Sequence, residues 1–183
     1  MNILSLILVI LAGTVLLLLL MALVLPKHYS VKVSETINKP KNKVYDYVSS
    51  FQNQIYYSEW LKADPDLQPT VVGADGTVGA ILKWESFNED KNKNVGKGEQ
   101  EIKKMDANNI EVELRLIKPM EGTCKIINNF AEIGINQTDY TCTFYAYAKF
   151  PINLPSFLIG RHFIKKNQQQ TLNNIKKIIE QAS

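Results

Sequence analysis

The sequence predicts an α+β domain in which a curved antiparallel sheet of about six or seven strands surrounds a long C-terminal helix, with one transmembrane helix in front. Three observations predict this architecture. An apolar run begins at residue 3, apolar and polar side chains alternate with period two between residues 78 and 149, and a helical apolar stripe ends the chain. The 183 residues are enough for one packed domain of ordinary size.

The N-terminal run predicts a membrane anchor. Residues 1–26 contain no Lys, Arg, Asp or Glu, and the run from Ile3 to Leu25 is interrupted only by Ser5, Gly13 and Thr14. A helix of this length would measure roughly 34 Å, which is enough to cross a hydrocarbon core of about 30 Å. A cleaved signal peptide is the alternative, but no basic residue precedes the run, which exceeds a signal-peptide core of about 7–15 residues. We therefore expect residues 1–26 to be a retained transmembrane anchor and residues 27–183 to form the folded domain.

The charges around the run predict its orientation. Five lysines follow it closely, whereas only the α-amino group precedes it: Lys27, Lys32, Lys39, Lys41 and Lys43. Positive charge tends to stay on the cytoplasmic side, so we expect a single-pass membrane protein with a cytoplasmic domain that contacts the lipid bilayer through residues 3–25. Translocation of the domain is the alternative, because long domains can cross regardless of charge.

The first elements of the domain are a strand and two short helices. Alternation over residues 29–38 predicts the strand, and the turn signal Asn38-Lys39-Pro40 places a proline near a helix start. Apolar residues then recur at helical spacing from Lys41 to Phe51, and a further helical turn is expected from Ile55 to Trp60.

Period-two alternation then predicts the sheet. The expected strands are residues 78–85, 96–103, 110–116, 123–132 and 139–149, separated by turn-forming segments. In the clearest of them Ile110, Val112, Leu114 and Leu116 should face inward, which is typical of an antiparallel sheet with one wet face. The chain closes with a helix over 154–182 whose apolar stripe contains Phe157, Phe163, Leu172 and Ile175 among others.

Composition argues against some functions. The formal net charge is only +3 and basic residues are interspersed with acidic ones, whereas a nucleic-acid-binding domain usually concentrates its basic residues on one face. The two cysteines, Cys124 and Cys142, match neither zinc spacing nor a CxxC redox site. We expect them to be small buried residues, with a disulfide between neighbouring strands as the alternative in an oxidising compartment.

Few residues suggest catalysis. His28 lies beside the apolar run and His162 on the last helix, and neither belongs to a known catalytic motif or metal-ligand cluster. Asp64 and Asp66 flank Pro65, where paired carboxylates more often turn the chain than transfer protons. Gly73-x-x-Gly76-x-x-Gly79 lacks the helix and the Lys-Ser/Thr pair of a phosphate loop and predicts a hairpin turn instead.

The order of elements resembles the helix-grip fold of START-like (SRPBCC) proteins, and particularly the bacterial polyketide cyclase/dehydrase branch. The resemblance covers about residues 29–181. It rests on Pro40 to Val48, Trp60 with Asp64-Pro65, Gly79 with Trp84-Glu85, Gly96-x-Gly98 and Leu172-x-x-Ile175-Lys176. The sequence departs from this branch at Tyr56-Tyr57, where a second tryptophan is common, and at Cys142, where an aromatic residue is common.

The resemblance implies an internal cavity for a hydrophobic small molecule or lipid, with no cofactor and no metal. The cavity-lining residues that it suggests are Trp60, Trp84, Gln100, Leu114, Phe130, Cys142, Phe144, Phe157 and Phe163. For Trp84 and Phe144 packed core is an equal alternative, and inward-facing Gln100 and Asn128 would need polar partners, which a ligand or a trapped water could supply. Two other functions stay open: a polyketide cyclase/dehydratase-like enzyme, and a ligand-free membrane-tethered interaction module.

Overall fold

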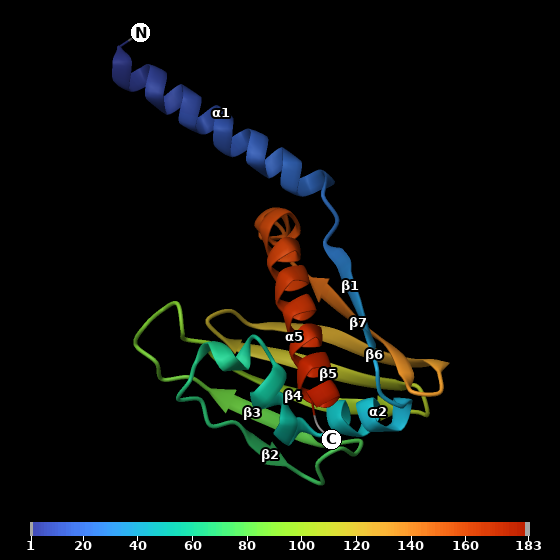
Figure 1. Ribbon diagram of the computed structural model, residues 1–183. Coiled ribbons are helices and arrows are strands. Elements are labelled where there is room, and N and C mark those ends of the chain that lie inside the picture. The colour runs from blue at the N-terminus through green and yellow to red at the C-terminus, as the bar shows by residue number, and fades with distance from the viewer. Residues whose placement is uncertain (1, 182–183) are drawn as a thin grey trace.

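A computed structural model describes residues 2–181 of the chain. Its centre is one seven-stranded antiparallel sheet with the strand order β1-β7-β6-β5-β4-β3-β2 (Figure 1). The strands are β1 (His28–Ile37), β2 (Thr70–Val72), β3 (Ile81–Glu85), β4 (Lys97–Met105), β5 (Asn109–Lys118), β6 (Gly122–Gly134) and β7 (Gln137–Tyr147). The predicted α+β, helix-grip architecture is confirmed.

The helices lie on one face of this sheet, apart from α1. They are α1 (Ile3–Val24), α2 (Lys41–Ser49), η1 (Phe51–Asn53), α3 (Gln54–Tyr57), η2 (Leu61–Ala63), α4 (Asn153–Pro155), the π-turn η3 (Ser156–Gly160) and α5 (Arg161–Gln181). Helix α5 crosses the concave face of the sheet, and α1 projects away from the domain beyond the N-terminal end of α5 (Figure 1).

The structure corrects several predicted boundaries. The strand expected from Val78 begins only at Ile81, because Gly76 and Gly79 adopt φ values of 72° and 89° in the preceding turn. Strand β2 was missed because it has only three residues. The helical turn expected to reach Trp60 ends at Tyr57. The last helix begins as a short α4 and a π-turn before α5, and its predicted final residue, 182, lies outside the described residues.

The register of the sheet excludes the disulfide alternative. Cys142 on β7 pairs with Asn128 on β6, so Cys124 lies four residues along β6 from the position opposite Cys142. At about 3.3 Å per residue the offset is roughly 13 Å, far beyond the Cα separation of about 7 Å that a disulfide can bridge. Both thiols are free, with Cys142 buried and Cys124 half-buried.

Helix α1 is attached to the domain at its C-terminal end. The Asn153 side-chain amide donates to the carbonyl oxygens of Ala22, at 2.7 Å, and Leu25, at 3.0 Å. The Ala148 amide N–H also donates to the Lys27 carbonyl oxygen. The last carbonyls of a helix have no partner within the helix, so Asn153 serves as a tertiary cap of α1. The end of α1 is therefore bonded to the segment that joins β7 to α5.

Helix α1 is long and apolar enough to cross a membrane, and it is the only such helix among the described residues. Its most apolar window is 6% buried, so its side chains do not form part of the core of the domain.

Candidate functional site

Burial of the inward-facing side chains changes along the sheet. At the end distant from α1, inward side chains are 0–2% exposed, as for Ile37, Ile102, Ile110 and Phe130, and Leu172 and Ile175 of α5 cover them. At the end nearest α1, Leu114, Ile126, Phe144 and Ala146 are 6–9% exposed, and Tyr29, Leu116 and Cys124 beyond them are half-buried. Trp84, which lies in register with Leu116 through Gly98, is the exception at 4% exposed. The inward side chains of β1, β5, β6 and β7 are therefore more exposed at the end of the sheet nearest α1 than at the distant end.

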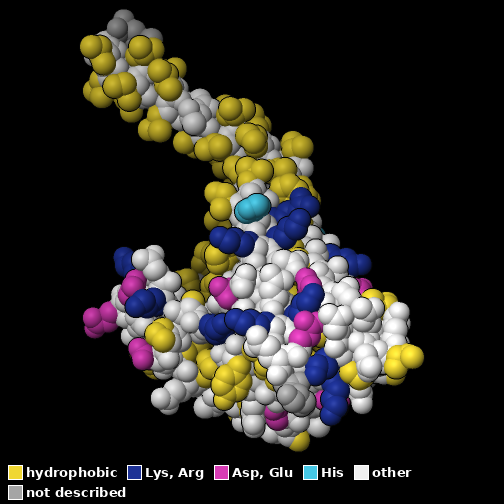
Figure 2. Space-filling model, in the orientation of Figure 1, with side chains coloured by type: hydrophobic (Ala, Val, Ile, Leu, Met, Phe, Trp, Pro, Cys, Tyr) yellow, Lys and Arg dark blue, Asp and Glu magenta, His cyan; other side chains and the backbone are white. Residues whose placement is uncertain are grey.

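We define the open end by its half-buried inward residues: Tyr29, Trp60, Gln100, Leu116, Cys124 and Ile164. They come from β1, the loop after α3, β4, β5, β6 and α5. Figure 2 shows hydrophobic side chains in the depth of the hollow between the main body and the lobe formed by the β3–β4 connection. The lining of the open end is therefore mostly apolar.

Aromatic contacts hold the rim of the open end. The Trp60 ring meets Phe163 of α5 edge to face, with centroids 6.1 Å apart. The Tyr29 ring meets Phe157 of η3 in the same way at 5.8 Å, and its hydroxyl shares a 3.0 Å hydrogen bond with Ser156. Such pairs contribute about 0.5–1.5 kcal/mol beyond area burial, so they attach η3 and the start of α5 to the sheet and to the Trp60 loop.

Three hydrogen bonds pair polar side chains inside the domain. The Gln54 amide donates to Gln100 at 3.1 Å, and the Cys142 thiol donates to Gln168 of α5 at 3.5 Å. The Tyr140 hydroxyl donates to Asn128 at 2.9 Å. Gln100 and Asn128 therefore have hydrogen-bond partners within the protein, and neither requires a ligand or a trapped water.

Burial extends the pH range over which these interior groups are neutral. Desolvation raises the pKa of the Cys142 thiol to about 12 and raises the pKa of the Tyr57 and Tyr140 hydroxyls well above their usual values. The thiol and both hydroxyls therefore stay protonated near neutral pH. The interior is an uncharged environment with a few hydrogen-bonding groups.

Trp60 carries the one buried donor at the open end that has no acceptor among the described residues. Its indole Nε1 is inaccessible to solvent and makes no hydrogen bond. Leaving a buried donor unpaired costs about 1–3 kcal/mol. A bound molecule with a hydrogen-bond acceptor would remove this cost.

The nine residues that sequence reasoning suggested occupy different environments. Trp60, Gln100 and Phe157 lie half-buried at the open end, and Leu114, Cys142 and Phe144 lie deeper in the interior. Phe130 is fully buried at the closed end, stacked on Tyr140 at 4.9 Å.

The remaining two suggested residues, Trp84 and Phe163, lie at opposite extremes of burial. Trp84 packs against Gly98 and donates to the Val95 carbonyl oxygen at 3.4 Å, so it is part of the packed core. Phe163 is 54% exposed at the rim.

Four of the six residues that define the open end are not among the nine: Tyr29, Leu116, Cys124 and Ile164. Sequence reasoning also missed Gln168, which accepts from the Cys142 thiol, and Gln54, which is the partner of Gln100. Gln168 sits in a stretch of α5 that is polar nearly all round, so only the position of the sheet shows which side faces inward.

The residues considered for catalysis do not assemble. The Asp64 carboxylate accepts from Ser86, Asn88 and the Asp66 amide, and the first two hydrogen bonds hold its pKa below the usual value. Asp64 therefore fastens the loop after η2 to the β3–β4 connection, as expected for a residue that turns the chain. His162 is exposed on α5, and His28 is exposed at the start of β1.

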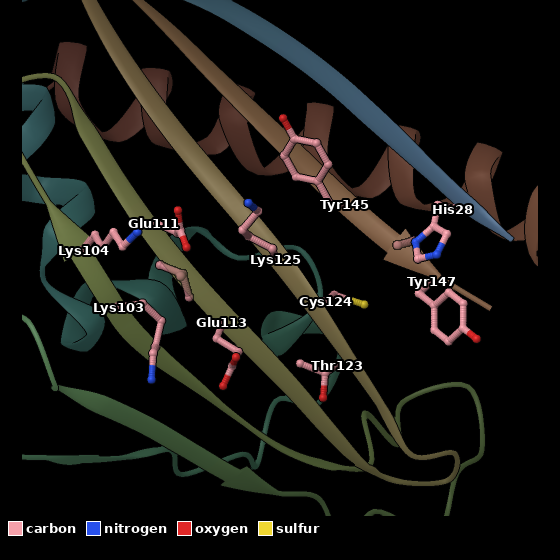
Figure 3. A pocket seen from close by; sticks show the side chains of 12 residues that line it. His28, Lys103, Lys104, Glu111, Glu113, Thr123, Cys124, Lys125, Tyr145 and Tyr147 are labelled. Carbon is pink, nitrogen blue, oxygen red and sulfur yellow. The ribbon is translucent and has the colours of Figure 1, made fainter. Parts of the chain in front are cut away.

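The outer face of the sheet carries a groove of about 380 Å³. Charged and aromatic side chains line it, including Lys103, Glu111, Lys125, Tyr145 and Tyr147 (Figure 3). A smaller hollow of about 350 Å³ lies between the start of α2 and the β4–β5 turn. Both lie outside the interior, and the charged walls of the first do not suit an apolar ligand.

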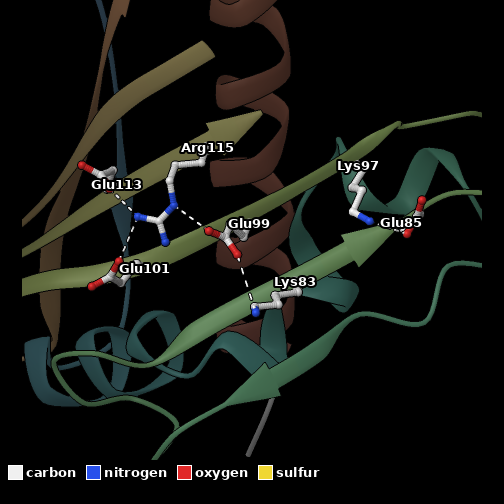
Figure 4. Close-up of polar contacts among 7 residues, drawn as sticks. All are labelled: Lys83, Glu85, Lys97, Glu99, Glu101, Glu113 and Arg115. Carbon is white, nitrogen blue, oxygen red and sulfur yellow. Dashed lines mark hydrogen bonds and ion pairs between the residues drawn. The ribbon is translucent and has the colours of Figure 1, made fainter. Parts of the chain in front are cut away.

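An ion-pair cluster on the same outer face joins β4 to β5. The Arg115 guanidinium donates to Glu99 at 2.6 Å, to Glu101 at 2.9 Å and to Glu113, and Lys83 of β3 lies 3.8 Å from Glu99 (Figure 4). Because Glu101 and Glu113 face each other across the two strands, the Arg115 guanidinium relieves their repulsion. The cluster has a structural explanation and does not point to a substrate.

Comparison with known proteins defines the fold. No protein-family model and no curated protein matches the sequence. Among solved structures, norcoclaurine synthase from Thalictrum flavum, in complex with dopamine and hydroxybenzaldehyde, aligns with a TM-score of 0.62 at 11% identity, over 85% of this chain and 88% of that one.

Two further structures are similar. TTHA0849 from Thermus thermophilus has a TM-score of 0.59 at 15% identity over 85% of this chain and 99% of that one. The di-domain aromatase/cyclase BexL has a TM-score of 0.59 at 16% identity, over 86% of this chain and 52% of that one. The domain thus has a Bet v1-like, SRPBCC-type fold, and at these identities the likeness shows the fold alone.

Proposed function

We propose that this protein is a membrane-tethered helix-grip domain that binds an apolar small molecule or lipid at its open end. One observation supports the proposal: the inward apolar side chains are fully buried at the end distant from α1 and partly exposed at the end nearest α1. An apolar molecule gains about 25 cal/mol for each Å² removed from water, so this lining is suited to such a ligand. Norcoclaurine synthase, with dopamine and hydroxybenzaldehyde, illustrates small molecules held by this fold.

The proposal includes anchoring of α1 in the membrane with the domain on the cytoplasmic side. An exposed apolar helix of 22 residues would be costly in water, and a bilayer removes that cost. Lys27, Lys149 and Arg161 are exposed close to the end of α1, and positive flanks of this kind favour the cytoplasmic side.

The ligand that fits the open end has an apolar body and a hydrogen-bond acceptor. Leu116, Cys124 and Ile164 supply apolar contacts, and the buried Trp60 N–H supplies an unpaired donor. The Gln54–Gln100 pair lies at the same end and adds adjustable donors and acceptors. Few polar groups in a mostly apolar lining are typical of small-molecule sites.

Native mass spectrometry of the full chain tests the proposal. The chain is purified in a mild detergent and incubated with a lipid extract. It is then released from the detergent micelle in the spectrometer, and bound molecules are identified by fragmentation. We expect a reproducible apolar adduct at one-to-one stoichiometry. A bare mass before and after incubation would contradict the proposal and favour a ligand-free interaction module.

Two neighbouring residues on β5 provide a matched pair of variants. Leu116→Trp places a large ring in the open end, whereas Ile117→Trp places the same ring on the outer face of the sheet, because adjacent strand residues point to opposite faces. We expect the first variant to lose the adduct and the second to keep it. Retention of the adduct by Leu116→Trp would place the binding site elsewhere.

A further inference from the structure

Several exposed apolar side chains occur in the segment that joins β7 to α5. We call Phe150, Ile152, Leu158, Ile159 and Phe163 the juxtamembrane patch; their side chains are 41–72% exposed. They belong to the segment after β7, the π-turn η3 and the start of α5. A soluble surface seldom keeps this many large apolar side chains together unless something covers them.

The patch is continuous with the membrane anchor. Asn153, in the middle of this segment, is 1% exposed and donates to the Ala22 and Leu25 carbonyl oxygens at the end of α1. These hydrogen bonds hold the segment within contact distance of the point where α1 ends. If α1 spans a bilayer, the segment that holds Asn153 must lie at the surface of that bilayer.

The patch is also continuous with the open end. Phe163 belongs to the patch, and its ring packs edge to face on Trp60 of the open end at 6.1 Å. The ring of Phe157 in η3 packs on Tyr29, which also belongs to the open end. An apolar surface therefore leads from the end of α1 to the opening of the interior.

The charges around the patch identify the surface that would cover it. Lys27, Lys149, Arg161, Lys165 and Lys166 are exposed around the same segment. Figure 2 shows lysine and arginine side chains gathered below the apolar helix, at its junction with the body of the domain. Exposed apolar side chains with basic side chains around them are the combination that binds the interfacial region of anionic membranes.

We propose that the juxtamembrane patch inserts into the interface of an anionic lipid bilayer and holds the open end against the membrane. This inference rests on the proposed anchoring of α1, and it adds a second, independent contact between the domain and the lipid. The domain is then held at a defined orientation by the Asn153 cap, the patch and the basic residues. An apolar ligand can pass between the bilayer and the interior along the patch without entering bulk water.

Bromolipid quenching of tryptophan on the full chain in vesicles tests this proposal. Ile159→Trp places a fluorophore in the patch, at a site that is 72% exposed, and Ile135→Trp places one in the β6–β7 turn, at a site that is 91% exposed at the other end of the sheet. In phosphatidylcholine vesicles with about a third phosphatidylglycerol, we expect brominated lipid to quench the added emission of Ile159→Trp several-fold more than that of Ile135→Trp. The emission of the unmodified chain is subtracted from both.

A second pair of variants tests the role of charge. Lys165→Gln with Lys166→Gln removes two charges beside the patch, and Lys43→Gln with Lys177→Gln removes two exposed charges elsewhere. We expect only the first pair to lower the quenching of Ile159→Trp to the value found in vesicles of phosphatidylcholine alone.

Equal quenching of Ile159→Trp and Ile135→Trp overturns the proposal. The proposal is also overturned if, in vesicles without brominated lipid, the new tryptophan of Ile159→Trp becomes more shielded from water as the protein concentration rises. A second copy of the chain would then cover the patch. The measurement requires no ligand. A chain that binds no apolar molecule can still pass it, and a chain that fails it can still give an adduct in the mass spectrometer.

Discussion

Replacing Gly98 by Ala tests whether the interior beside Trp84 is packed or hollow. A Cβ atom at Gly98 would lie 2.5 Å from Cζ2 of Trp84 and 2.9 Å from the Arg115 carbonyl oxygen. Both distances are too short for non-bonded atoms, and the second neighbour is backbone. The Trp84 ring is 4% exposed and would therefore have to move within a packed environment.

The expected cost follows from two effects of the displacement. Overpacking of a core costs about 1–3 kcal/mol. Loss of the hydrogen bond from Trp84 to the Val95 carbonyl oxygen costs about 1 kcal/mol more. Alanine in a strand recovers about 0.5–1 kcal/mol relative to glycine, so we expect Gly98→Ala to destabilise the domain by about 1–3.5 kcal/mol.

Gly122→Ala is the matched control. No atom lies within 4 Å of a Cβ at Gly122, so this variant should be neutral or more stable by about 0.4–1 kcal/mol. Urea unfolding of the full chain in detergent, followed by tryptophan fluorescence, gives both values. If the two variants differ by less than about 0.5 kcal/mol, the Trp84 ring has free space to move into and the description of it as packed core is wrong.

Three further predictions concern other interior and loop residues. Tyr140→Phe removes the donor to buried Asn128 and should lower the free energy of unfolding by about 1–3 kcal/mol in the same urea experiment; an unchanged value would contradict the hydrogen bond. The pKa of Asp64 is lower in the folded protein than in the unfolded chain, so its stabilising effect is present above the unfolded pKa of about 4 and is lost as the pH falls through the folded pKa. In the Asp64→Asn variant the melting temperature should therefore fall less steeply as the pH is lowered below about 4. A fall identical to that of the parent chain would refute this role. Burial raises the pKa of Cys142 to about 12, so we expect iodoacetamide at pH 8 to modify this thiol only as fast as the domain opens; rapid modification of the folded protein, seen by mass spectrometry, would show that it is accessible.

The sequence was sufficient to predict the sheet because its strands alternate clearly. Ile110, Val112 and Leu114 face inward as their spacing predicts, since one wet face imposes period two. Strand β2 was not predictable, because three residues carry too little periodicity. The late start of β3 depends on the positive φ angles of Gly76 and Gly79, which the alternation pattern does not contain.

The candidate site was only partly predictable, because it depends on which end of the sheet leaves its inward side chains partly exposed. Phe130 and Phe157 are both aromatic residues on predicted core faces, yet Phe130 is fully buried at the closed end and Phe157 lies near the rim. The orphan donor of Trp60 and the cap that Asn153 provides for α1 both join segments distant in sequence. Such contacts appear only when the chain is folded.

The central claim is that an acceptor-bearing apolar molecule occupies the open end next to Trp60. The protein has two tryptophans, so a sample with ¹⁵N-labelled tryptophan should give two indole N–H signals in the NMR spectrum of the full chain in detergent micelles. Trp84 already donates to Val95 and serves as an internal control, whereas the Trp60 donor is unpaired. Addition of a lipid extract should shift the Trp60 signal downfield to saturation and leave the Trp84 signal in place, with Trp60→Phe giving the assignment. If neither signal moves, or if both move together without saturation, no ligand occupies the open end and the proposed function is wrong.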